Sequence, residues 1–213
     1  MQKVSWFLVS WVLGFKDILC FQKEKVEGRK LFKIDPSKPT VLVVGGSLGA
    51  LTINHAIAQN IQKLKAIGVN LIWQTGISFQ HKAQEFTKEV NVRGINSYAF
   101  IEDMHKAYAV ADVIISRAGA IAISELCCIG KPVILVPSPN VAENHQYKNA
   151  QSLVNKNAAL LVEDDQLNCK LVDILKGLLK SEDNQASLSS NIKKIAITDA
   201  ADRIAEIALE LVR

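Results

Sequence analysis

The sequence has few cysteines, and their positions argue against both a metal centre and a disulfide framework. It contains only four in 213 residues, namely Cys20, Cys127, Cys128 and Cys169. None of them has metal-ligand spacing, and the side chains of adjacent residues in a helix diverge. We therefore expect free thiols in a reducing cytosol and no metal site. We also expect no cofactor.

Long apolar runs and dense clusters of charge are missing as well. The apolar residues 5–15 are followed by Lys16 and Asp17, whereas a membrane-spanning helix needs about 20 apolar residues. The lysines are scattered and the formal net charge is only +4, so we expect no nucleic-acid partner. A mild positive charge still fits an anionic partner or an anionic membrane surface. No internal repeat is present, which excludes a repeat architecture.

The first 39 residues form two segments that differ from the rest of the chain. Residues 1–22 are apolar and contain Trp6 and Trp11, which predicts a helix that packs on the domain or lies in a membrane interface. The alternatives are a signal peptide, which the lack of a clean cleavage site disfavours, and a start left by truncation. Residues 23–39 are rich in charge and end in Asp-Pro-Ser-Lys-Pro, which predicts a linker.

Residues 40–213 alternate between short apolar runs and helix-compatible segments, and 49% of the whole chain is hydrophobic. This alternation predicts an α/β fold with a parallel sheet, right-handed crossovers and one buried core. Strands are expected at residues 41–44, 69–74, 92–98, 111–115, 133–136 and 158–162. Helices are expected between the strands and from residue 166 onward.

Residues 116–137 carry the clearest functional signal. Gly119 lets the backbone turn sharply out of one strand, a helix is expected over residues 120–129, and Gly130 ends it. The first-turn N–H groups of such a helix favour an anion, most often a phosphate. Glu125 lies on the same helix face as Ile121, where a carboxylate can accept both hydroxyls of a ribose. The alternative is a solvated Glu125 beside an ordinary turn.

A second glycine-rich turn, Gly-Gly-Ser-Leu-Gly-Ala at residues 45–50, follows the first strand. It is related to the dinucleotide-binding fingerprint without matching it, and it lacks the lysine of a phosphate-binding P-loop. It predicts either a close approach to a phosphate or a turn that merely packs. An NAD site is disfavoured, because the next strand ends in Gln74 and not in an acidic residue.

Five motifs occur in a fixed order: GGSLGA, FIEDM, SRAGAIAISEL, GKPVILVP and NHQYKNA. This order resembles the C-terminal, donor-binding half of the MurG family of glycosyltransferases (glycosyltransferase family 28), over residues 24–213. The resemblance implies a Rossmann-like parallel sheet with helices on both faces, the C-terminal half of a GT-B glycosyltransferase. It also implies transfer of N-acetylglucosamine from UDP-N-acetylglucosamine to the lipid-linked muramyl-pentapeptide precursor of peptidoglycan, by a cytoplasmic enzyme peripheral on the inner face of the cell membrane.

The resemblance assigns roles to individual residues. Ser47 would hold the diphosphate, the backbone of Ile101 would lie against the uracil, and Arg117 would balance the diphosphate charge. Many members carry a threonine where this chain has Ala122, so one hydroxyl contact to phosphate is lost. The helix turn would bind the nucleotide, with Glu125 on the ribose, and the HQ pair would contact the donor sugar; these residues are Gly119, Ala120, Ile121, Ala122, Ile123, Ser124, Glu125, His145 and Gln146.

The resemblance also implies a missing part, since family members have an N-terminal domain that binds the acceptor and supplies the catalytic base. We therefore expect no catalytic residue in this chain, and we expect His55, His81 and His105 to be ordinary surface residues. The chain would supply the donor-binding half and be inactive alone, with the acceptor reached through a missing domain or partner. The alternative is a non-catalytic nucleotide-sugar-binding subunit of a split glycosyltransferase, or an interaction module.

Overall fold

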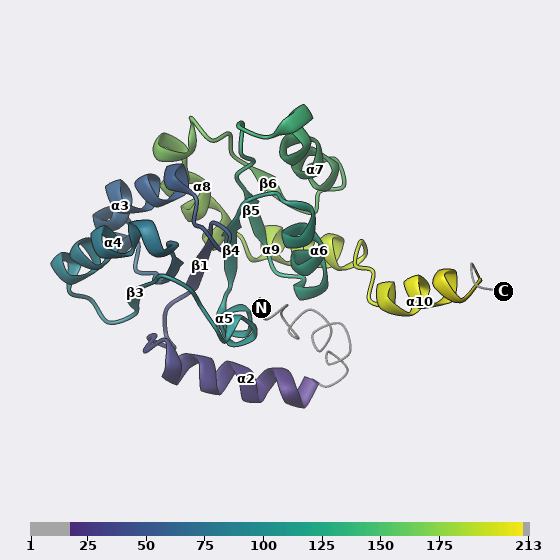
Figure 1. Cartoon of the computed structure of the whole chain (residues 1–213). Helices are drawn as coiled ribbons and strands as arrows, with labels where there is room; N and C mark the ends of the chain where they lie inside the picture. Colours follow the sequence, from purple (N-terminus) through teal and green to yellow (C-terminus); the bar gives the residue numbers. More distant parts are fainter. Residues whose placement is uncertain (1–17, 211–213) are drawn as a thin grey trace.

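A parallel sheet forms the centre of the computed structural model, which describes residues 18–210 (Figure 1). The sheet has six strands in the order β3-β2-β1-β4-β5-β6, and every neighbouring pair is parallel. The strands are β1 Thr40–Val44, β2 Asn70–Gln74, β3 Ile95–Tyr98, β4 Val113–Ser116, β5 Val133–Leu135 and β6 Leu160–Leu161. The strand order reverses between β1 and β4, as in doubly wound nucleotide-binding folds. The α/β fold class is confirmed.

Helices cover both faces of the sheet. Their bounds are α2 Ile18–Leu31, α3 Leu51–Ala66, α4 Ile77–Val90, α5 Met104–Val110, α6 Ala120–Ile129, α7 His145–Val154, α8 Leu167–Lys180, α9 Glu182–Lys193 and α10 Ala200–Glu210. Val41 and Val43 of β1 face a core shared with α3, α4 and α8. Leu42 faces the opposite core, shared with α5, α6 and α7. Strands buried on both faces explain why they are continuous apolar runs in the sequence.

The structure has a helix where the sequence predicts a linker. Helix α2 runs through Leu31 and packs on α5 (Figure 1). At their crossing a side chain on Gly28 would come within 2.7 Å of the Lys106 carbonyl oxygen, so the two backbones touch. Residues 23–31 are therefore part of the domain, and only residues 32–39 connect α2 to β1. The proposed interfacial segment with Trp6 and Trp11 lies outside the described residues.

The carboxyl ends of all six strands lie level with one another. The register places in one row the residues Tyr98, Gln74, Val44, Ser116, Leu135 and Leu161. The loops that follow the strands therefore leave the sheet side by side at one edge, which we call the carboxyl edge. The opposite edge, where the strands begin, is the amino edge. No helix within residues 18–210 is long and apolar enough to cross a membrane.

Candidate functional site

The reversal of strand order places two glycine-containing turns side by side. Val44 at the end of β1 pairs with Ser116 at the end of β4, and neighbouring strands lie about 4.8 Å apart. The turn at residues 45–50 and the turn at residues 117–119 therefore flank the same crevice. Open α/β sheets bind their ligands at this point.

The first of these turns interlocks with the turn that follows β2. Gly46 and Gly49 have φ angles of +90° and +82°, and the Gly49 N–H donates to the Gly46 carbonyl at 3.1 Å. A side chain on Gly49 would overlap the Thr75 carbonyl, and one on Gly76 would overlap the Leu48 carbonyl. These glycines allow two backbones to touch, and Ser47 is left exposed at the tip.

A buried amide holds the start of α3 against the same place. The Asn54 Nδ2 donates to the Thr75 carbonyl at 2.7 Å, and its Oδ1 accepts the Trp73 indole N–H at 2.9 Å. Asn54 is 3% exposed, so water does not compete for these hydrogen bonds. The glycine-rich turn is therefore fixed from both of its sides.

Gln74 joins this turn to the segment that contains Ile101. Its Nε2 donates to the Gly46 carbonyl at 3.2 Å, while its Oε1 accepts the Ile101 N–H at 3.0 Å. Gln74 is 2% exposed and terminates β2. In the sequence, Gln74 argues only against an NAD site, and its linking role was not predicted. A polar residue at the end of an apolar strand was the available signal.

Helix α6 presents an open N-terminus to the crevice. Its N-cap residue is Gly119, and no side chain caps the helix. A Cβ placed on Gly119 would meet nothing within 4 Å, so space remains above the first turn, and Ile121 is 66% exposed beside it. The unpaired N–H groups and the helix dipole favour an anion here, as the sequence predicts.

The other residues of this helix turn have more local roles. Ile123 packs on the core beneath the helix, and the Ser124 hydroxyl donates to the Ala120 carbonyl at 3.0 Å. Ala122 is half-buried. The Ile123 N–H donates to the Gly119 carbonyl at 2.9 Å, so among these three residues only Ala122 lies in the first turn, where the N–H has no partner within the helix.

Glu125 is half-buried and hydrogen-bonded, unlike the solvated residue of the alternative interpretation. The Tyr108 hydroxyl of α5 donates to the Glu125 Oε2 at 3.3 Å. Burial raises the pKa of Glu125, and the Tyr108 hydrogen bond opposes this shift by stabilising the carboxylate. Burial also raises the pKa of Tyr108, which keeps the phenol neutral and able to donate. The pair presents an oriented carboxylate about one and a half turns into α6.

Arg117 is paired within the chain. Its Nη1 donates to the Val136 carbonyl at 3.1 Å and to the Asp164 carboxylate. Both side chains are 15% exposed, so Asp164 already balances the Arg117 charge. The pair ties together the loops after β4, β5 and β6. Asp164 was missed by sequence reasoning because it lies 47 residues from Arg117.

Helix α7 starts beside the α6 turn. The Asn149 Nδ2 donates to the Ala118 carbonyl at 3.2 Å. The Gln146 Oε1 accepts the Ser138 N–H at 2.9 Å, which leaves its Nε2 to face a ligand, and the ring of the exposed His145 lies 2.9 Å from the Ala142 carbonyl. The structure thus brings Ser47, Ile101, Gly119, Glu125 and the α7 start to one edge of the sheet.

The remaining histidines lie away from this edge. His55 and His81 are exposed, as the sequence predicts. His105 is not an ordinary surface residue, since it is half-buried on α5 and lies 3.2 Å from Glu24 of α2. Among residues 18–210 no group of three or more histidine, cysteine, aspartate or glutamate side chains is arranged to hold a metal ion.

A doubly wound sheet with an open helix N-terminus at its switch point defines a Rossmann-like domain of the GT-B glycosyltransferase type. Residues 40–204 match the model of the glycosyltransferase family 28 C-terminal domain, so the chain belongs to this family.

Curated relatives share much of this sequence. A protein of Cytophaga hutchinsonii is 46% identical over 197 residues, which are 92% of this chain and 52% of the relative. A protein of Phocaeicola vulgatus is 48% identical over 186 residues, which are 87% of this chain and 50% of the relative. Both are named UDP-N-acetylglucosamine–N-acetylmuramyl-(pentapeptide) pyrophosphoryl-undecaprenol N-acetylglucosamine transferase. The chain spans about half the length of these relatives.

Solved structures show the same arrangement. MurG from Acinetobacter baumannii has a TM-score of 0.73 and 26% identity, over 87% of this chain and 53% of that chain. The C-terminal CMP-Kdo binding domain of WaaA from the same organism has a TM-score of 0.60 at 15% identity, and 98% of it is covered. The second likeness concerns the fold alone.

Proposed function

We propose that this chain is the donor-binding half of a transferase that moves N-acetylglucosamine from UDP-N-acetylglucosamine to the lipid-linked muramyl-pentapeptide precursor of peptidoglycan. Membership of glycosyltransferase family 28 and the names of relatives at 46% and 48% identity support this proposal. The single observation that carries it is the open α6 N-terminus with Glu125 beside it at the switch point.

Each part of the nucleotide sugar has a matching group at the carboxyl edge. The diphosphate lies on the α6 N-terminus and Ser47, and the ribose hydroxyls donate to Glu125. The Ile101 N–H already donates to Gln74, so the uracil donates a hydrogen bond to the Ile101 carbonyl. The sugar lies against His145 and the free Nε2 of Gln146. Arg117 acts indirectly, because its ion pair with Asp164 holds the loops around the diphosphate.

This half of the enzyme stabilises the leaving group. The acceptor hydroxyl attacks the anomeric carbon, the bond from that carbon to the diphosphate oxygen breaks, and UDP departs with the electron pair. The positive end of α6 stabilises the charge that develops on the diphosphate. A base must take the proton of the acceptor hydroxyl, and we assign that base to a domain or partner outside this chain.

Several apolar side chains are exposed at the carboxyl edge, and they favour a second half of the enzyme that covers this edge. They follow four different strands and include Leu48 at 87% exposure, Ile77 at 84% and Phe100 at 58%, together with Leu51 and Ile121. Apolar side chains gathered at one edge are typical of a surface that is buried in an interface. We infer that the acceptor-binding half lies against this edge.

We also propose a cytoplasmic location at the inner face of the cell membrane. The proposed acceptor is a lipid, so the transfer must occur at a membrane surface. Cys127, Cys128 and Cys169 are free thiols, which fits a reducing compartment. Burial raises the pKa of the Cys127 thiol to about 11. We therefore expect Cys127 to pack in the core as an unreactive thiol and not to act as a nucleophile.

Calorimetric titration tests the donor site. UDP-N-acetylglucosamine is expected to bind more tightly than UDP-glucose, and NAD is expected not to bind. Glu125→Ala should weaken the affinity for UDP-N-acetylglucosamine at least about tenfold, because two charge-assisted hydrogen bonds are lost. Glu85→Ala removes an exposed carboxylate from α4 and is the matched control. Equal binding by the Glu125 variant would contradict the assignment.

A transfer assay tests the half-enzyme proposal. The purified chain should bind the donor without turnover, and turnover by the chain alone would refute the proposal. Turnover after addition of an acceptor-binding half would identify a transferase. Donor binding without turnover in every combination would favour the alternative, a non-catalytic subunit that holds a nucleotide sugar for a split enzyme.

A further inference from the structure

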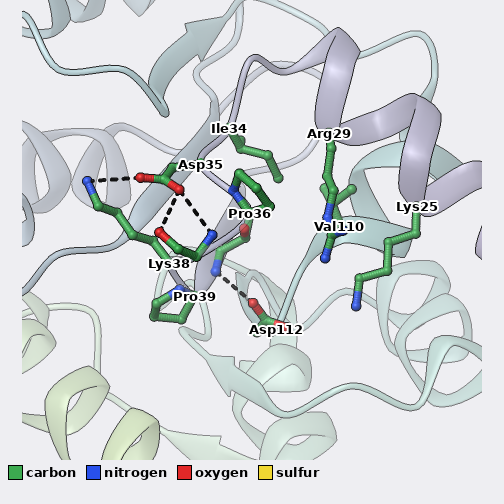
Figure 2. Close-up of a pocket in the computed structure, with 11 residues that line it drawn as sticks. Lys25, Arg29, Ile34, Asp35, Pro36, Lys38, Pro39, Val110 and Asp112 are labelled. Atoms are coloured by element: carbon green, nitrogen blue, oxygen red, sulfur yellow. Dashed lines mark hydrogen bonds and ion pairs between the residues drawn. The ribbon is translucent and has the colours of Figure 1, made fainter.

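A polar cavity lies at the amino edge of the sheet. It has a volume of about 240 Å³ and is enclosed by α2, by the segment that leads into β1, and by the end of α5 with Asp112 (Figure 2). Five residues of β1 separate this cavity from the crevice at the carboxyl edge. It is therefore not part of the donor site.

Two cations of α2 point into this cavity without a partner. Lys25 and Arg29 are one helical turn apart and extend from α2 on the side where Asp112 lies (Figure 2). Neither side chain makes a hydrogen bond or an ion pair with another of residues 18–210. The two glutamates of α2 are used elsewhere, because Glu24 pairs with His105 and Glu27 pairs with Lys106, each at 3.2 Å. The acidic side chains of α2 thus face α5, and Lys25 and Arg29 face the cavity.

The carboxylates at the cavity are already engaged. Asp35 accepts the Ser37 hydroxyl at 2.7 Å and pairs with Lys38 at 3.5 Å, and hydrogen bonds from Ser37 lower the pKa of Asp35. Asp112 accepts the Thr40 N–H at 2.8 Å. Three cations (Lys25, Arg29 and Lys38) and two carboxylates (Asp35 and Asp112) line the cavity, so one positive charge is left in excess.

The half-buried Lys131 places another positive charge near Asp112. Burial lowers the pKa of Lys131, and repulsion from Lys25 and Lys193 acts in the same direction, while attraction to Asp112 opposes the shift. Positive charges are thus crowded around Asp112. An anion in the cavity would relieve this repulsion.

The cavity is rigid, which lowers the cost of binding. The Asn70 side chain is fully buried and closes the loop that forms one wall. Its Nδ2 donates to the carbonyls of Asp35 and Lys38 at 2.8 and 3.0 Å, and its Oδ1 accepts the Asp35 N–H at 2.9 Å. The opposite wall, α2, is fixed by its backbone contact with α5 at Gly28.

We propose that this cavity binds a phosphate group, with Lys25 and Arg29 as its direct ligands. The planar guanidinium of Arg29 suits two phosphate oxygens, and Lys25 supplies a point charge beside it. The group belongs either to a soluble phosphate or to a phospholipid headgroup. In the second case the amino edge faces the membrane and α2 lies at its surface. The proposal does not depend on the donor or the acceptor of the transferase.

Nuclear magnetic resonance of the whole chain, titrated with inorganic phosphate, tests the site. The backbone amides of Ser37, Lys38 and Thr40 should shift, and Lys25→Ala/Arg29→Ala should weaken this binding at least about tenfold, because hydrogen bonds to a charged group are lost. Phosphate bound at α6 shifts the amides of residues 119–122 instead and is unaffected by the variant. Circular dichroism verifies that the variant is folded.

The matched control removes the same charge from exposed positions of the same helix. Lys23→Ala/Lys30→Ala should change the phosphate affinity less than about twofold, as expected for screened surface charges. Equal weakening by both variants would mean unspecific attraction to a basic surface and would overturn the proposal. So would phosphate binding that leaves the amides of Ser37, Lys38 and Thr40 unshifted.

Vesicle sedimentation identifies the source of the phosphate. If a headgroup is the ligand, vesicles of phosphatidylcholine with phosphatidylglycerol should bind the chain, vesicles of phosphatidylcholine alone should bind less, and Lys25→Ala/Arg29→Ala should abolish the difference. If Lys25→Ala/Arg29→Ala weakens the binding of inorganic phosphate but leaves vesicle binding unchanged, the ligand is a soluble phosphate. No response to the variant in either assay would refute the site.

Discussion

The two ends of strand β2 each carry a buried amide, and the two amides stabilise different kinds of structure. At the amino edge, Asn70 makes three hydrogen bonds to one loop, over residues 35–38. At the carboxyl edge, Gln74 links two separate segments, at Gly46 and Ile101. The first amide closes a loop on itself, whereas the second aligns two loops with each other.

This difference separates stability from function within one strand. The loop at the amino edge has its polar groups paired by the chain itself, and its free charges come from α2. The carboxyl edge keeps unpaired donors at the start of α6 and exposed apolar side chains. Unpaired donors and exposed apolar side chains reduce stability unless a ligand or a partner covers them. Changes at the two ends of β2 should therefore have separable effects.

The largest effect is expected where the two turns of the carboxyl edge touch. Gly49→Ala should reduce the free energy of unfolding by about 4 kcal/mol, because the new methyl group overlaps the Thr75 carbonyl at a positive φ. Gly46→Ala has a similar φ and no neighbour within 4 Å, so it should cost only about 1 kcal/mol. Urea unfolding measures both. Equal losses of unfolding free energy in the two variants would show that the contact between the turns does not contribute to stability.

Asn70→Ala should reduce stability by about 2 kcal/mol, because it removes three hydrogen bonds to the half-buried backbone groups of residues 35 and 38. The same variant should leave the affinity for UDP-N-acetylglucosamine unchanged, since the carboxyl edge is not altered. Urea unfolding and calorimetry provide the two values. A large loss of donor affinity in a folded Asn70 variant would remove the distinction between the two ends of β2.

Gln74→Ala should affect donor affinity more than Asn70→Ala does, at a similar cost in stability. We expect a loss of about 2 kcal/mol in stability, since the Ile101 N–H remains buried and unpaired. The affinity for UDP-N-acetylglucosamine should fall about tenfold, because the two loops are no longer held in the binding geometry. Asn70→Ala is the control in the same calorimetric series. If Gln74→Ala binds the donor as the unmodified chain does, Gln74 has a purely structural role.

The smallest effect concerns the orientation of Glu125. Tyr108→Phe should weaken the affinity for UDP-N-acetylglucosamine about threefold, which is the effect expected for the loss of one neutral hydrogen bond. The donor needs an ionised Glu125, whose pKa lies above the ordinary value near 4.5, so affinity should decline as the pH falls through the raised pKa. Removal of the hydroxyl raises the pKa further and should move this decline to higher pH.

A calorimetric series against pH measures this shift in the Tyr108 variant. Tyr98→Phe, which removes a phenol hydroxyl from β3, is the matched control and should leave the decline in place. A Tyr108 variant with weaker binding and an unmoved pH profile would show that the hydroxyl acts through packing alone.

Local patterns predicted much of the fold. The helix at residues 120–129 and the strand ending at Gln74 lie where the apolar runs and glycines place them. The linker prediction missed α2, because a segment rich in charge has no obvious apolar face and its contact with α5 depends on Gly28. The roles of Gln74, Asn70 and Asp164 were not predictable either, since their partners lie 27 to 47 residues away. Such pairings depend on the register of the folded sheet.

A crystal structure of the chain with UDP-N-acetylglucosamine would show whether the carboxyl edge is a donor site. We expect the diphosphate between Ser47 and the N-terminus of α6, with both ribose hydroxyls on Glu125. A nucleotide bound at any other place, or a ribose that does not contact Glu125, would contradict this expectation.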